Sequence, residues 1–79
     1  MQIKAAVGEV ISRSGLSKIR ISQLMGKTDN YVYSLLNKRT NPSSGTLTTI
    51  GDICGYELVF RKRGSTNESD VIVLDPPEN

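Results

Sequence analysis

Apolar side chains recur at helical spacing along the first two thirds of the chain. In residues 2–14 polar residues separate an apolar set made of Ile3, Val7, Val10 and Ile11. This spacing places the apolar side chains on one face of a helix, and the glycine that follows, Gly15, is a typical helix stop. The pattern predicts an amphipathic helix over residues 2–14.

Two short helices are predicted next. Ser17 can cap a helix that Gly26 ends, with inward positions at Ile21, Leu24 and Met25. Thr28 can cap a third helix that runs to about Lys38, and its apolar stripe consists of Tyr31, Val32, Leu35 and Leu36. Only residues 26–28 then separate the second helix from the third.

A loop and a fourth helix follow. Residues 39–45 are rich in turn formers, and Pro42 makes a continuing helix unfavourable. Ser43 or Ser44 can cap the next helix, which Gly55 ends and whose inner side carries Leu47, Ile50, Ile53 and Cys54.

After Gly55 the apolar period changes from helical to the two-residue repeat of a strand, with Tyr56, Leu58 and Phe60 alternating with other residues. A polar loop at 64–69 leads to a second strand at 71–74, which Pro76 and Pro77 end. We therefore predict a mainly α fold with a helical domain at 1–55, C-terminal strands forming a strand or β-hairpin at 56–75, and a frayed tail at 76–79.

A two-stranded hairpin is marginal in water, so these strands need a surface to pack on. A second copy of the chain that exchanges edge strands would supply one, and the helices of the same chain are the alternative. In the first case the strands form a homodimer interface, and loss of residues 65–79 weakens the dimer. The expected dimerisation residues are Tyr56, Leu58, Phe60, Val71, Ile72 and Val73.

Charge divides the chain into a basic body and an acidic end. All ten Lys and Arg lie in residues 1–63 beside four acidic residues, whereas residues 64–79 carry a net charge of −4. A basic body suits a polyanionic partner, although the same charges also fit an ordinary solvated surface.

The composition argues against several other classes. The chain has no histidine, one cysteine, no glycine-rich phosphate loop and no clustered carboxylates, so we expect no enzyme activity, no cofactor and no metal site. Cys54, on the inner stripe of its helix, is expected to be a small buried hydrophobe. No apolar run is long enough for a bilayer and no secretory signal is recognisable, so we expect no membrane contact and a cytoplasmic location.

Two short helices joined by a tight glycine turn form a helix-turn-helix, whose second helix can present side chains to the major groove. The positions between the helices are small or apolar: Ile21, Ser22, Met25, Val32 and Leu35. The runs 16–26 and 27–37, continued by Asn41-Pro42-Ser43 and Cys54-Gly55, resemble the XRE family, the Cro and phage-repressor class, over about residues 3–60. The resemblance implies a four-helix Cro/repressor-like domain that binds double-stranded DNA as a dimeric transcriptional regulator, a repressor by analogy.

The family's base-reading positions fall on Thr28, Asp29, Asn30, Tyr33 and Ser34. Asn30 and Ser34 are the favoured pair, because asparagine can contact adenine through two hydrogen bonds and serine can donate or accept. Asp29 either accepts from cytosine or caps the third helix.

The family's phosphate contacts fall on Lys18, Lys27, Lys38, Arg39, Thr40 and Asn41. These residues would set affinity and register on the duplex. The alternative is that they form only a solubilising face.

The sequence also departs from the family pattern. Leu36 and Ile11 stand where members often have an ion pair, so an apolar contact is expected there, and Lys38 replaces the usual glycine after the third helix. The terminal strand at 56–60 resembles a subset that includes antitoxins. The alternative function is therefore an antitoxin-like or other protein-interaction module that binds a partner, such as a toxin, through its C-terminal strands.

Overall fold

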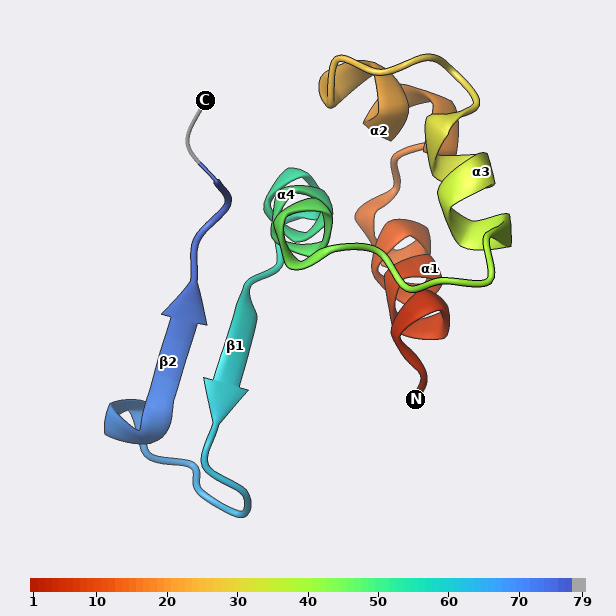
Figure 1. The fold of residues 1–79 in the computed structure, drawn as a ribbon. Helices are drawn as coiled ribbons and strands as arrows, with labels where there is room; N and C mark the ends of the chain where they lie inside the picture. The colour runs from red at the N-terminus through yellow and green to blue at the C-terminus, as the bar shows by residue number, and fades with distance from the viewer. Residues whose placement is uncertain (78–79) are drawn as a thin grey trace.

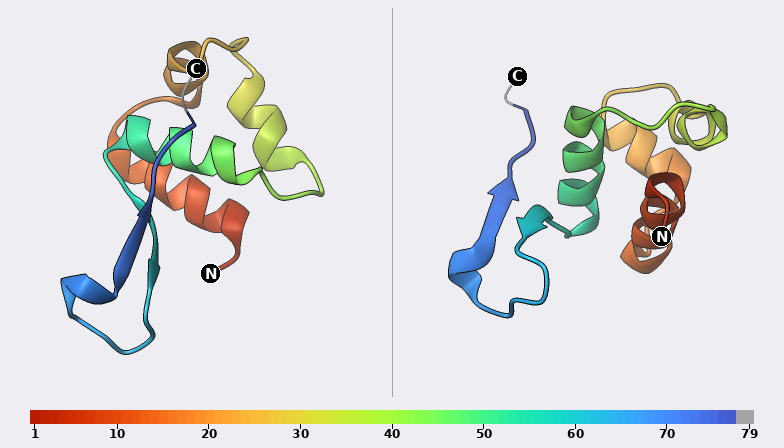
Figure 2. Two further views of the ribbon diagram at one scale, coloured as in Figure 1. Left: turned by 60° about the vertical axis from the view of Figure 1, so that its left-hand side comes forward. Right: turned by 60° about the horizontal axis from the view of Figure 1, so that its bottom comes forward.

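The computed structural model describes residues 1–77 and has a mainly α architecture that ends in a β-hairpin (Figure 1). The elements are α1 (Ile3–Ser14), α2 (Lys18–Leu24), α3 (Tyr31–Asn37), α4 (Ser44–Cys54), β1 (Leu58–Arg61), a 3₁₀ turn η1 (Glu68–Asp70) and β2 (Val71–Leu74). Helix α1 packs against α4, and α2 packs against α3. The hairpin lies on the opposite side of α4 from α3 in Figure 1 and in the right view of Figure 2.

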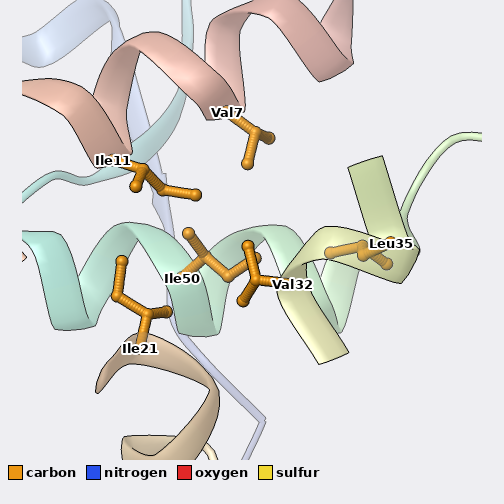
Figure 3. Close-up of a cluster of buried hydrophobic side chains, with 6 residues drawn as sticks. All are labelled: Val7, Ile11, Ile21, Val32, Leu35 and Ile50. Atoms are coloured by element: carbon orange, nitrogen blue, oxygen red, sulfur yellow. The ribbon is translucent and has the colours of Figure 1, made fainter. Parts of the chain in front are cut away.

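All four helices contribute to one hydrophobic core (Figure 3). Its fully buried apolar members are Val7, Ile11, Ile21, Val32, Leu35 and Ile50. Each buried side chain of this kind stabilises the fold by roughly 1.5–3 kcal/mol relative to an exposed one. Leu36 packs against the cluster that contains Ile11, and the direct contact between these two side chains stays a prediction.

Local signals in the sequence determine where most helices begin and end. The Ser17 side chain accepts a hydrogen bond from Arg20 N at 3.0 Å and caps α2 as predicted. Gly26 and Gly55 have φ of 71° and 81°, the left-handed conformation that glycine adopts without strain. After α4, Gly55 N bonds to Asp52 O and Tyr56 N bonds to Gly51 O, which is a Schellman motif.

This motif corrects the predicted start of the first strand. The sequence pattern predicted that the strand starts at Tyr56. The Tyr56 N–H instead donates to Gly51 O at the end of α4, and β1 begins at Leu58. The strands pair with each other, antiparallel, with Phe60 opposite Ile72 and Val59 opposite Val73. The two strands therefore form a hairpin within one chain.

Two further predictions were wrong in detail. Leu24 was assigned to the inner stripe of the second helix but is 48% exposed, because the buried side of α2 carries Ile21 and Ser22 and continues to Met25, which leaves Leu24 to one side of it. Helix α3 begins at Tyr31 rather than near Thr28, so residues 25–30 separate it from α2. Pro76 and Pro77, the first residues of the predicted tail, lie beside the start of α4, where a Cβ on Gly45 would be 3.4 Å from Pro77 Cγ. Residues 78–79 of the predicted tail lie outside the described part of the chain.

Candidate nucleic-acid interface

A buried hydroxyl joins α2 to α3. Ser22 is completely buried, donates to Lys18 O at 2.8 Å and accepts from Val32 N at 3.1 Å. Val32 N is one of the first N–H groups of α3, which have no partner within their own helix. The bond therefore satisfies an orphan donor and fixes the relative position of the two helices. The other residues predicted to lie between α2 and α3 are also inside the fold. Ile21, Val32 and Leu35 are buried, and Met25 is half-buried.

The opposite face of α3 is polar and open to solvent. All five predicted base-contacting residues are exposed: Thr28, Asp29, Asn30, Tyr33 and Ser34. They occupy the turn before α3 and the outer side of its first turn, while Val32 and Leu35 point into the core. The face is thus available to a ligand without disturbing the packing beneath it.

Lysine side chains lie over tyrosine rings at two points of this surface. Lys18 Nζ is 4.8 Å from the centroid of the Tyr33 ring, and Lys27 Nζ is 5.5 Å from that of Tyr31. Both distances fall within the range of cation–π attraction. Tyr33 therefore holds the cation at the start of α2 beside the exposed face of α3, and the sequence pattern did not indicate this role.

Asp29 does not cap α3. The N-cap residue is Asn30, whose side chain makes no cap hydrogen bond, and Asp29 Oδ1 instead accepts from Gln23 Nε2 at 3.3 Å. The suggestion that Thr28 caps this helix is wrong as well, because Thr28 contributes its carbonyl, which accepts from Tyr31 N at 3.0 Å. The Asn30 amide is consequently not engaged in capping.

The loop after α3 carries the second group of predicted contacts. Lys38, Arg39, Thr40 and Asn41 are all exposed, as is Lys27 on the turn before α3, whereas Lys18 is half-buried. Lys4 Nζ donates to Lys38 O and so brings a further cation from α1 to this loop. The sequence analysis missed Lys4, because the contact joins residues 34 positions apart and no local pattern signals it.

The described residues also include a half-buried thiol and an apolar groove. Residues 1–77 contain no cluster of metal-ligating side chains and no helix long and apolar enough to cross a membrane. Burial raises the pKa of the half-buried Cys54 thiol, which disfavours the reactive thiolate. An apolar groove of about 190 Å³ lies between α1, α4 and the start of β1, with walls that include Ile3, Val10, Leu47 and Leu58.

Comparison with known proteins gives no match to a family model, to a curated protein or to a solved structure.

Proposed function

We propose that the chain binds double-stranded DNA in a sequence-specific way, with α3 in the major groove of the duplex. The observation that carries the proposal is the exposed polar face of α3, which Ser22 holds in a fixed position against α2. A helix in the major groove needs such a face, because base edges are distinguished by hydrogen bonds from projecting side chains.

The cations around this face support the proposal. Lys18 and Lys27 flank α3 at its start, and Lys38 and Arg39 follow its end. Contacts from both ends of a recognition helix to phosphates fix its register in the groove, while the residues between them discriminate bases. We assign base contacts to Asn30 and Ser34 first, since both side chains carry hydrogen-bonding groups and both are exposed.

The four helices and their order fit a Cro/repressor-like domain, the fold that the sequence resemblance implied, and we propose that the chain acts as a dimeric transcriptional regulator. A dimer of such domains binds a near-palindrome whose half-sites lie one helical turn apart, roughly 34 Å. The regulatory outcome we propose is repression of transcription, which rests on analogy with the family alone.

The test is selection of bound sequences from a random duplex pool at two salt concentrations. We expect the wild-type chain to enrich a two-fold symmetric site, and Asn30→Ala with Ser34→Ala to lose that preference while still binding duplexes weakly. Each lost base contact should lower discrimination by about 1–3 kcal/mol.

The matched control is Thr66→Ala with Ser69→Ala, two exposed polar residues on the hairpin, away from α3. This control should select the same site as the wild-type chain. Absence of any enriched site at either salt concentration, with the protein folded, would refute sequence-specific reading.

A further inference from the structure

A hollow of the surface, the proline hollow, lies between the turn before α3, the start of α4 and the end of the described chain. Its volume is about 520 Å³, and sites for small molecules occupy roughly 300–1,000 Å³. Its wall is formed by Met25, Lys27, Tyr31, Ser43, Gly45, Thr46, Thr49, Pro76 and Pro77. Polar and apolar side chains share this wall, unlike that of the apolar groove beside α1. A ligand that matches it has both a polar and an apolar part.

The proline hollow carries a positive charge. Lys27 is the only charged residue in its wall. The Lys27 side chain is exposed and makes no ion pair with any described residue. Asp75, which precedes the two prolines, lines a different hollow together with Asp52 and Thr48. The charge of Lys27 is therefore available to a negatively charged ligand.

A hydroxyl donor lies in the same wall. The Thr46 hydroxyl oxygen accepts from the Ser43 hydroxyl at 3.0 Å, and the Ser43 oxygen accepts from Thr46 N at 3.3 Å. The Thr46 hydroxyl hydrogen has no acceptor among residues 1–77, so it can be donated to a ligand oxygen. Thr49, one turn further along α4, already donates to Gly45 O. An ammonium group and a free hydroxyl hydrogen together form a donor set that suits a carboxylate.

The rest of the wall suits a flat ring. Met25 and Tyr31 both pack against the hydrophobic core, which fixes their positions from beneath. Pro76 and Pro77 add two apolar rings from the end of the described chain. Lys27 Nζ lies 5.5 Å from the centroid of the Tyr31 ring, so the cation is next to this apolar part of the wall. Aromatic rings pack favourably on tyrosine and on methionine sulfur.

We propose that the proline hollow binds a small aromatic carboxylate, with its ring against Tyr31 and its carboxylate on Lys27 and Thr46. A simple anion would leave the apolar wall uncovered, and a neutral ring would leave the cation without a partner. The inference goes beyond the proposed function and does not depend on it, because the wall of the hollow is complete without DNA.

Phenylacetate is the probe that tests the site. Amide chemical shifts in two-dimensional NMR spectra of the full chain at neutral pH show where it binds. We expect saturable shifts at Lys27, Tyr31, Gly45 and Thr46, with a dissociation constant of about 1–10 mM. Phenylacetamide keeps the ring and loses the charge, whereas acetate keeps the charge and loses the ring. Each of these two probes should bind at least about threefold more weakly than phenylacetate.

Two variants remove the donors one at a time. Lys27→Gln removes the charge, and Thr46→Val removes the hydroxyl while keeping the shape of the side chain. Each should weaken the binding of phenylacetate by about two- to tenfold and reduce its advantage over phenylacetamide. The matched control is Lys62→Gln with Thr66→Val, which makes the same two changes at exposed positions of the hairpin and should bind as the wild type does.

Four results would overturn the proposal: shifts that do not saturate, shifts that fall in the apolar groove between α1 and α4, equal binding of phenylacetate and phenylacetamide, or a control variant as impaired as Lys27→Gln. Equal binding of acetate and phenylacetate would do the same, because the start of α4 would then bind any small anion. The comparison of probes uses the wild-type chain, so it decides the matter even if a variant does not fold.

Discussion

Ser22 combines a small volume with a hydroxyl that has two partners. Its size lets α2 approach α3, and its oxygen accepts from Val32 N and donates to Lys18 O. Among the described residues no buried side-chain polar atom lacks a hydrogen-bond partner. An alanine of similar size would preserve the packing and lose the bond, so the two contributions can be separated.

Ser22→Ala should destabilise the protein by about 1–3 kcal/mol, because it leaves the Val32 N–H buried without a partner. The free energy of unfolding, measured by chemical denaturation and followed by circular dichroism, checks this. Ser12→Ala, at an exposed position of α1, is the control and should change stability by no more than about 0.5 kcal/mol. Equal stability of the two variants would mean that the hydroxyl contributes nothing.

Sequence patterns identified which residues lie at the interface between α2 and α3 but not how polar side chains pair across space. Asn30 and Ser34 were expected at the surface from the family resemblance, and both are exposed. The Gln23 bond to Asp29 and the Lys4 bond to the loop after α3 depend on the relative placement of separate elements. Such contacts carry no signature in local spacing.

At the scale of whole elements, caps and stops were the most predictable features. Ser17 begins α2, and Gly26 and Gly55 end α2 and α4, because each supplies a backbone geometry or an acceptor that its neighbours cannot. The start of α3 was not predictable in this way, since the turn before it is closed by the Thr28 carbonyl and not by a side chain. For α4 the sequence left two adjacent serines as candidates, and the structure selects Ser43.

Ser43→Ala should therefore cost about 0.5–2 kcal/mol of stability, since Thr46 N loses the side-chain acceptor that lies 3.3 Å away. Ser44→Ala changes the neighbouring residue inside the helix and should be neutral or slightly stabilising, because alanine has the higher helix propensity. Thermal unfolding of the two variants side by side makes the comparison. A larger loss for Ser44→Ala would show that the cap has been assigned to the wrong serine.

Helix α4 separates two groups of cations in the molecule. The cations at 18, 27, 38 and 39 surround α3, whereas Arg61, Lys62 and Arg63 form the tip of the hairpin on the other side (Figures 1 and 2). The excess of positive charge in residues 1–63 was visible in the sequence, but its division between two sides depends on where the hairpin lies. Counting charge along the chain could not separate the cations around α3 from those of the hairpin.

Salt dependence of DNA binding distinguishes the two groups of cations. Lys38→Gln with Arg39→Gln removes two proposed phosphate contacts, so the slope of log affinity against log salt should become shallower by about two for each protomer bound. Lys62→Gln with Arg63→Gln removes the same charge from the hairpin tip and should leave the slope nearly unchanged. Fluorescence anisotropy with a labelled duplex at several salt concentrations gives both slopes. If the slope becomes equally shallow in the two double variants, the affinity reflects the net charge of the molecule. The loop after α3 would then make no phosphate contacts of its own.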